Sequence, residues 1–365
     1  MKILLLGEYS NVHWTLAEGL RELGHEVCVV SGGDFWKNYP SDIAIVRRNY
    51  GKAAGVRYLA EVLCKLPRFR GYDVVQLINP CFFELKASKN LWLYKYLRRH
   101  NKKVFLGAFG NDYYWVKTCI ENKTFRYSDF FINGKPRQTP YTEKEIKEWI
   151  GSDKERVNRY MAHDCNGIIG CLYEYWASYA PYFPEKSTFI PLPVSNSLIR
   201  ERSGEKPEKA NFFIGIQRER SHVKGTDIME RALDRIAADY PDQCHVRKAV
   251  SVPYAEYKEM LDASDIILDQ IYSYTPAMNA LLGMAKGMVA VSGGEPENYS
   301  VLKEEHLRPI VNVLPDEEDI YRKLEQLVLH PEQIPHLQRE SVEYVRKHHE
   351  AVGVARRYLE FWESH

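Results

Sequence analysis

The chain has 365 residues, of which 45% are hydrophobic and 27% charged, enough apolar material for two globular cores. A net charge of +1 gives the molecule as a whole no attraction for nucleic acid. The seven cysteines include no C-x-x-C pair, and no stretch approaches the roughly 18 apolar residues of a membrane span, so we expect a cytoplasmic protein without disulfides.

The first half alternates short apolar strands with helices, which predicts a parallel sheet. Lys2–Gly7 is the first expected strand, and Asn11–Leu23 carries leucines at helical spacing. The alternation continues through Glu26–Val30, Asp73–Ile78, Leu91–Arg99, Lys103–Ala108, Gly167–Gly170, Glu174–Tyr182 and Ser187–Pro191. Trp115–Glu148 has weak periodicity, and we expect a loop-rich excursion of this first domain, of a length that is often functional.

A polar, charged stretch at Arg200–Ala210 is typical of a linker. The alternation then restarts, with strands and helices expected at Asn211–Ile216, Thr226–Asp239, His245–Val250, Tyr254–Asp262, Ile266–Asp269, Pro276–Ala285 and Met288–Ser292. The tail from Glu317 onward is helical. We therefore predict two Rossmann-like α/β domains, residues 1–198 and 211–349, joined by a linker at 199–210.

The turns that follow strands are the places to look for ligands, because open parallel sheets bind them beyond the carboxyl ends of their strands. The first turn, Gly7–Asn11, has neither a G-x-G-x-x-G pattern nor a P-loop lysine, which disfavours a nicotinamide enzyme or a P-loop kinase. The turn after 211–216 gathers Arg218, Arg220 and Lys224 ahead of Gly225 and a helix. Such cations neutralise a diphosphate leaving group; a solvated basic loop is the alternative.

Two later turns add to this pattern. Ser273, Tyr274 and Thr275 precede Pro276, which predicts an N-cap hydroxyl, a proline at the first helical position and helix amides that favour phosphate. Gly293 and Gly294 follow another strand and let the backbone approach a ligand closely. Three such turns in one domain favour a nucleotide diphosphate site.

The stretch Gly215–Gly225 resembles the R-x5-K-G segment of retaining GT-B glycosyltransferases of family 4, of the bacterial surface-polysaccharide type, with Arg218 and Lys224 at matching positions. Met284–Gly287 and Gly293-Gly294 are similar to a second block of that family, and both ends of the chain are similar to family members. The resemblance implies two doubly wound domains facing across a cleft. It also implies a nucleotide-sugar donor on 211–349, an acceptor mostly on 1–198, and a helix at 350–365 that packs back on the first domain.

The resemblance further implies that the diphosphate leaves from the face that the acceptor attacks. We expect neither a metal nor another cofactor. The family's E-x7-E pair falls on Tyr274 and Leu282, and its usual histidine on Phe109. We expect donor contacts from Gly215, Arg220, Gly225, Ser273, Tyr274, Thr275, Gly293 and Gly294, with Asp269, Asn279, Glu295 and Glu297 taking over hydroxyl recognition. On the acceptor side we expect Asn111 and Asp112 to orient the acceptor, surrounded by Glu8, Tyr9, His13, Phe109 and Gly110.

The segment from Arg47 to Lys103 has 14 Lys and Arg against three Asp and Glu, a charge of about +11 in a nearly neutral protein. With its interleaved aromatic residues, such a face could meet anionic lipid headgroups at the inner side of a membrane; a solvated face is the alternative. His163-Asp164 and His348-His349-Glu350 lack further ligands at useful spacing, so we expect no metal site.

The predicted function is therefore a nucleotide-sugar-dependent hexosyltransferase of polysaccharide biosynthesis, acting on a glycan or a lipid-linked acceptor. Two alternatives remain open. A sugar-nucleotide epimerase would use the same scaffold without an acceptor, and a catalytically silent sugar-nucleotide-binding subunit would account for the missing glutamates and histidine.

Overall fold

The computed structural model describes residues 1–34, 37–202 and 204–365. They group into two compact units. The first unit contains residues 1–124, 142–193 and 351–365, and the second contains 125–141 and 194–350. Residues 125–141 therefore group with the second unit, although they interrupt the sequence of the first.

The first unit is built on a seven-stranded parallel sheet in the order β3-β2-β1-β4-β5-β8-β9. Its central strands are continuous apolar runs because helices cover both faces, and Ile3 to Leu6 have no exposed surface. The strands are β1 (Lys2–Leu6), β2 (Glu26–Ser31), β3 (Ile43–Ala44), β4 (Val74–Leu77), β5 (Lys103–Ala108), β8 (Gly167–Gly170) and β9 (Ser187–Phe189).

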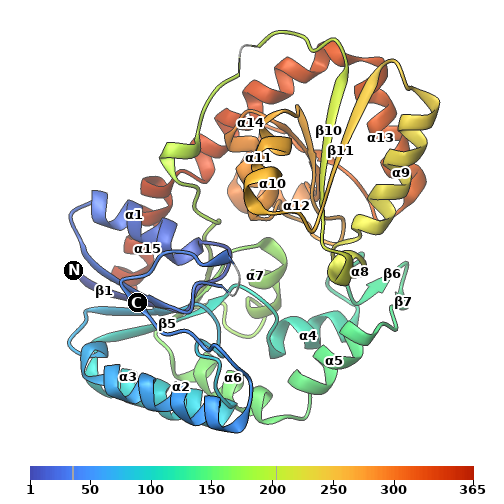
Figure 1. Cartoon of the computed structure of the whole chain (residues 1–365). Coiled ribbons are helices and arrows are strands. Elements are labelled where there is room, and N and C mark those ends of the chain that lie inside the picture. Colours follow the sequence, from blue (N-terminus) through green and yellow to red (C-terminus); the bar gives the residue numbers. More distant parts are fainter. Residues whose placement is uncertain (35–36, 203) are drawn as a thin grey trace. The chain divides into compact units, whose positions relative to one another are not determined.

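The helices of this unit form a layer on each face of its sheet, with α1 and α15 on one face and α2, α3 and α6 on the other (Figure 1). Gly19 makes the α1–α15 contact possible, since a Cβ there would lie 2.3 Å from the carbonyl oxygen of Ala351. The helices are α1 (Val12–Glu22), α2 (Lys52–Lys65), α3 (Ala87–His100), α4 (Tyr113–Glu121), α5 (Pro140–Trp149), α6 (Asp153–Asp164), α7 (Tyr173–Tyr179) and α15 (Ala351–Ser364).

The second unit has a five-stranded parallel sheet in the order β11-β10-β12-β13-β14. The strands are β10 (Ala210–Ile216), β11 (Cys244–Val250), β12 (Ile266–Leu268), β13 (Val289–Ser292) and β14 (Val311–Asn312). A separate two-stranded hairpin, β6 (Phe131–Ile132) with β7 (Lys135–Pro136), belongs to residues 125–141.

Helices again cover both faces of the second sheet, with α9 and α13 on one side and α10, α11 and α14 on the other (Figure 1). The apolar stripe of α9 (Met229, Leu233, Ile236) packs into a buried cluster with β10, β12 and β13. The helices are α8 (Ser221–Lys224), α9 (Thr226–Asp239), α10 (Tyr254–Asp262), α11 (Met278–Ala285), α12 (Pro296–Leu302), α13 (Glu317–Leu329) and α14 (Ile334–His348).

The predicted α/β class with two doubly wound parallel sheets is confirmed. The expectation that residues 115–148 are loop-rich was wrong at both ends, where α4 and α5 are regular helices. Consecutive residues Tyr113 to Val116 of α4 are all buried, so its sequence has no single apolar stripe. The Tyr114 ring packs on residues outside α4, with its centroid 4.4 Å from that of Tyr179 and 5.5 Å from that of Phe183.

Candidate functional site

The turn after β10 carries the predicted phosphate-binding cations. Arg218 and Arg220 form a single 3-10 turn and are exposed, while Lys224 ends the short helix α8. Arg218 points toward α9, where its Nη1 and Nη2 donate to the Glu230 carboxylate at 2.5 and 3.2 Å. These hydrogen bonds lower the pKa of Glu230. Arg220 makes no ion pair with any residue in the described part of the chain.

Gly225 gives this turn its shape. Its φ of +74° is in the left-handed region, and a Cβ there would lie 2.3 Å from Cγ1 of Ile271. The turn also receives a backbone hydrogen bond, because the Ile271 N–H donates to the Lys224 carbonyl at 3.0 Å. The ends of β10 and β12 are thereby joined, which brings Lys224 next to Asp269.

Asp269, directly after β12, is the centre of a buried polar group. It is 2% exposed, and its Oδ1 accepts from Lys224 Nζ at 3.0 Å and from Asn279 Nδ2 at 3.5 Å. Its Oδ2 is buried with no hydrogen-bond partner among the residues that the structure describes. The Asn279 Oδ1 accepts from the Tyr257 hydroxyl at 2.7 Å, and the Tyr257 ring lies against Gly215, where a Cβ would be 2.9 Å from Cε2. Tyr257, which the sequence did not single out, therefore contacts two predicted donor residues, Gly215 and Asn279, and Asn279 links it to Asp269.

The turn before α11 differs from the prediction. The helix begins at Met278 with Ala277 at the N-cap and no capping side chain, so the expected Thr275 cap and Pro276 first position were wrong. Residues 273–276 instead form an irregular segment that bends at Tyr274 and Thr275 before the helix. The Ser273 hydroxyl is buried there without a hydrogen-bond partner in the described ranges. The Tyr274 hydroxyl accepts from the Arg126 backbone N–H at 2.5 Å.

The two glycines after β13 are required by close contacts, Gly293 with backbone and Gly294 with a side chain. A Cβ on Gly293 would lie 1.9 Å from the Ser273 carbonyl oxygen, and one on Gly294 would lie 2.7 Å from Cγ2 of Ile310. The Gly294 N–H donates to Oδ1 of Asn312 at 2.8 Å. This backbone is thus packed directly against the turn after β12.

Glu295 and Glu297 are held by residues that the sequence missed. Arg126 binds both carboxylates, and the Tyr127 hydroxyl donates to Glu295 Oε1 at 2.6 Å. Both partners come from the segment with weak periodicity. The only signal there was its mixture of aromatic and basic residues, which does not say where the segment packs.

The predicted acceptor residues lie at the carboxyl edge of the first unit's sheet. Glu8 is buried, and its Oε1 and Oε2 accept from the backbone N–H groups of His13 and Trp14 at 3.3 and 3.0 Å. Burial outweighs these hydrogen bonds and raises the pKa of Glu8 to about 8. Burial lowers the pKa of His13 to about 3, and this ring lies edge-on to that of Phe109, with centroids 6.0 Å apart.

Asp112 has a structural task at the same edge. Its Oδ1 caps α4 by accepting from the Trp115 N–H at 2.9 Å, and its Oδ2 accepts from the Tyr179 hydroxyl at 2.6 Å. Burial raises the pKa of Asp112 to about 6. The Asn111 carbonyl accepts from Asn79 Nδ2 at 3.2 Å, and Gly110 lies near the Tyr9 ring, where a Cβ would be 3.4 Å away. The structure thus brings all seven predicted residues to one edge: Glu8, Tyr9, His13, Phe109, Gly110, Asn111 and Asp112.

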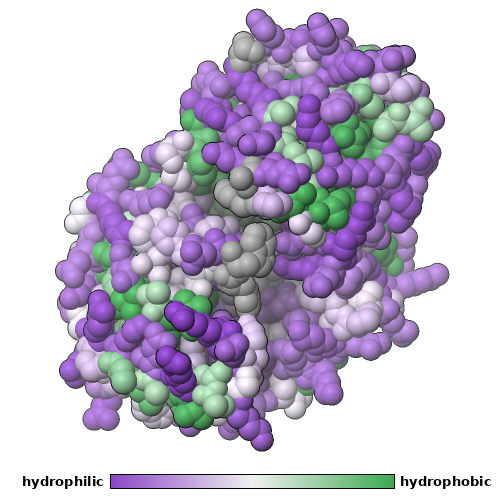
Figure 2. Space-filling model, viewed as in Figure 1, coloured by the Kyte–Doolittle hydropathy of each residue, from purple (hydrophilic) through white to green (hydrophobic). Residues whose placement is uncertain are grey.

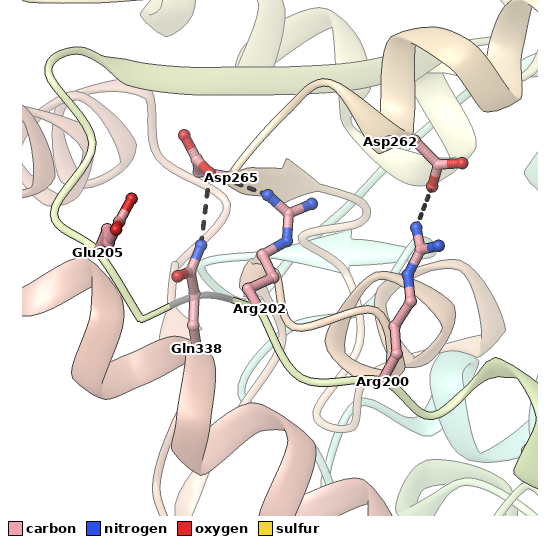
Figure 3. Close-up of a pocket in the computed structure, with 6 residues that line it drawn as sticks. All are labelled: Arg200, Arg202, Glu205, Asp262, Asp265 and Gln338. Atoms are coloured by element: carbon pink, nitrogen blue, oxygen red, sulfur yellow. Dashed lines mark hydrogen bonds and ion pairs between the residues drawn. The ribbon is translucent and has the colours of Figure 1, made fainter.

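An open pocket of about 320 Å³ lies elsewhere in the second unit. Figure 3 shows both arginines of the pocket directed at aspartates: Arg202 pairs with Asp265 at 2.9 Å and Arg200 with Asp262 at 2.8 Å. Asp265 immediately precedes β12, so the pocket is at the amino edge of the sheet, opposite to the turns described above. These ion pairs bind residues 199–210 to the rest of the second unit, so the arginines and aspartates that line the pocket are already neutralised by one another.

The described residues contain neither a metal-binding cluster nor a membrane-spanning helix. Within those ranges, no group of three or more His, Cys, Asp or Glu side chains is arranged to hold a metal ion. None of the helices described is both long and apolar enough to cross a bilayer.

Comparisons with known proteins give a fold. No protein-family model matches the sequence, and comparison with curated protein sequences finds no match. Among solved structures, the chain is similar to a sucrose-phosphate synthase from Thermosynechococcus elongatus (TM-score 0.62, 11% identity, 100% of this chain and 99% of that one). It is also similar to HepE from Anabaena in complex with UDP and glucose (0.60, 11%, 100% of both chains). A third is the catalytic domain of starch synthase IV from Arabidopsis thaliana bound to ADP and acarbose (0.59, 11%, 100% and 99%). At such identities the likeness establishes the GT-B fold over the whole chain.

Proposed function

We propose that this protein is a glycosyltransferase that moves a sugar from a nucleotide diphosphate sugar to a glycan or lipid-linked acceptor, with retention and without a metal. The observation that carries the proposal is the basic turn after β10, where Arg218, Arg220 and Lys224 follow the carboxyl end of a parallel strand. Support comes from the fold, which HepE and starch synthase IV use to bind UDP with glucose and ADP with acarbose.

The charge arrangement suits a diphosphate leaving group. Negative charge grows on the diphosphate as its bond to the sugar breaks, and cations placed beside it lower the barrier. Lys224 is the best placed, because its ion pair with Asp269 holds the ammonium group at the edge of the sheet. Asp269 keeps its second oxygen for a hydroxyl or N–H of the ligand. By analogy, removal of one oxyanion-hole donor in an acyl-transfer enzyme slows the reaction about 10²–10³-fold.

The test is the turnover of Lys224→Ala and Arg218→Ala with a panel of nucleotide sugars, beside Lys323→Ala on the exposed face of α13 as control. We expect both site variants to lose turnover and the control to keep it. Unchanged turnover in both would reject the assignment. The anomeric configuration of the product and the rate in a chelator test retention and metal independence separately.

We also propose that the lipid-linked acceptor is reached at an anionic membrane surface. Along α2 and α3, Val56 (69% exposed), Leu63 (41%) and Trp92 (50%) lie among exposed cations, and Figure 2 shows hydrophobic residues between hydrophilic ones over these helices. Apolar side chains in a basic surface favour the headgroup region of an anionic bilayer. Vesicles with phosphatidylglycerol should carry the protein in flotation, and vesicles of phosphatidylcholine alone should not. Equal flotation with both, or with neither, would refute this part.

One observation favours a second candidate, a catalytically silent sugar-nucleotide-binding subunit. Arg218, Lys224 and Arg126 are each already paired with a carboxylate, which reduces the net positive charge offered to a diphosphate. Nucleotide binding by calorimetry, with no transfer to any acceptor and no hydrolysis of the donor, would support that candidate over the enzyme.

A further inference from the structure

Residues 125–141, which we term the strap, lie along the carboxyl edge of the second unit's sheet. At one end, Arg137 Nη2 donates to the His222 carbonyl at 2.7 Å, and its guanidinium lies 4.1 Å from the centroid of the Tyr272 ring. At the other end, Arg126 and Tyr127 reach Glu295. The strap therefore contacts the turns that follow β10, β12 and β13, the same turns that carry the predicted donor residues.

The Arg126 end of the strap saturates two carboxylates. Arg126 Nη1 and Nη2 bind the two oxygens of Glu297 at 2.5 and 3.0 Å, and Nη2 also binds Glu295 Oε2 at 2.8 Å. With the Tyr127 hydroxyl on Glu295 Oε1, all four carboxylate oxygens are engaged. Glu295 is only 5% exposed, and a carboxylate so buried requires such partners. The hydrogen bonds from Arg126 also lower the pKa of Glu297.

The same residues enclose Tyr274. Its ring centroid is 5.5 Å from that of Phe125, 5.1 Å from that of Tyr127 and 4.9 Å from the Arg126 guanidinium. The oxygens of Glu295 and Glu297 and the Tyr274 hydroxyl are thus occupied by the strap, which leaves Asp269 as the predicted acidic residue with an unpartnered oxygen in the described part of the chain.

We infer that Arg126 and Tyr127 are positioning residues of the donor half-site, acting through Glu295 on the backbone of Gly293 and Gly294. This inference rests on the proposed function. Two consecutive glycines have more backbone freedom than any other pair, and ordering them costs binding free energy. Glu295, the next residue, is anchored through both of its carboxylate oxygens. This anchor holds Gly293 and Gly294 against Ser273 before the ligand arrives.

The second unit offers a closely matched control. Arg235 on α9 binds the carboxylates of Glu317 and Glu318 and lies 4.3 Å from the centroid of the Tyr321 ring on α13. Its side chain is 44% exposed against 54% for Arg126. Arg235→Ala therefore removes the same kind of contact, one guanidinium on two carboxylates and a tyrosine, without touching the strap.

The experiment measures the Kd of UDP-glucose by calorimetry for wild type, Arg126→Ala, Arg126→Lys, Tyr127→Phe and Arg235→Ala, with circular dichroism to confirm folding. We expect Arg126→Ala to weaken binding about tenfold or more and Arg235→Ala to stay within about twofold. Arg126→Lys should recover only part of the loss, since an ammonium cannot bind two carboxylates in bidentate geometry. The Kd of Tyr127→Phe should lie between that of the control and that of Arg126→Ala.

A pH series separates positioning from charge repulsion. Without Arg126, the pKa of Glu297 returns toward its ordinary value, so lowering the pH toward 4 neutralises that carboxylate but does not restore the anchor on Glu295. The affinity of Arg126→Ala should therefore stay below that of wild type at the same pH, and full recovery would assign the loss to the charge of Glu297 and overturn the inference. If the wild type binds the nucleotide sugar and Arg126→Ala binds it as tightly as Arg235→Ala does, the inference is overturned and the proposed function stands. Absence of binding by wild type to any nucleotide sugar would instead overturn the proposed function, and the inference with it.

Discussion

Glu8 makes a quantitative test of the first unit possible. Its carboxyl group is buried between the end of β1 and the start of α1, and burial raises its pKa from 4.5 to about 8. In the unfolded chain this group ionises near its ordinary pKa, whereas in the folded chain it stays protonated until the pH approaches 8. The unfolded state therefore gains from ionisation over a range in which the folded state does not, and stability falls as the pH rises from about 5 to 8.

The expected size follows from this difference in pKa. Between pH 6.5 and 8.5, a shift from 4.5 to about 8 lowers the free energy of unfolding by about 2 kcal/mol. Glu8→Gln removes the titration while keeping the side-chain shape and one acceptor for the amides of His13 and Trp14. The range lies above the pKa of Asp112 and that of His13, about 6 and about 3.

The assay is urea unfolding of wild type and Glu8→Gln at pH 6.5, 7.5 and 8.5, with Glu22→Gln, at the exposed last residue of α1, as control for the loss of a charge. From pH 6.5 to 8.5, the free energy of unfolding of the wild type should fall by about 2 kcal/mol more than that of Glu8→Gln, and Glu22→Gln should behave as wild type. If wild type and Glu8→Gln have parallel profiles, the carboxylate is already ionised in the fold, and its two backbone hydrogen bonds outweigh burial.

Two further predictions concern the second unit. Gly293→Ala places a Cβ 1.9 Å from the Ser273 carbonyl oxygen, so it should lower the free energy of unfolding by about 1–3 kcal/mol and weaken nucleotide binding. The control, Gly55→Ala inside α2, should raise the free energy of unfolding by up to about 1 kcal/mol. Urea unfolding measures both variants, and equal effects would refute the close contact at Gly293. Lys224→Met leaves the buried Asp269 charge without its cation and should lower the free energy of unfolding by up to about 3 kcal/mol. This loss is smaller than for a fully buried pair because the lysine side chain is 31% exposed. The double variant with Asp269→Asn should be more stable than Lys224→Met alone. A double variant no more stable than Lys224→Met would show that the pair is not coupled.

The sequence predicted the elements whose periodicity is carried by aliphatic residues. β5, β8, α9 and α10 begin and end where expected, since buried parallel strands and helices with one apolar stripe leave a pattern that depends only on local spacing. The helices α2 and α6 were not predicted. α6 consists largely of charged and polar residues, and on α2 only Tyr58 and Val62 are buried, so each presents a mostly polar or exposed surface with little stripe to detect.

Local chemistry also predicted the turns that carry Lys224, Asp269 and the Gly293-Gly294 pair, because parallel strands bring their carboxyl ends to one edge whatever the details of packing. Sequence alone could not say which polar atoms at that edge are occupied. Arg126 is separated from Glu295 by 169 positions along the chain, and the pairing depends on residues 125–141 folding with the second unit. Long-range contacts between side chains leave no periodic trace, so only the tertiary structure showed that the strap saturates Glu295 and Glu297 and leaves an oxygen of Asp269 unpartnered within the described residues.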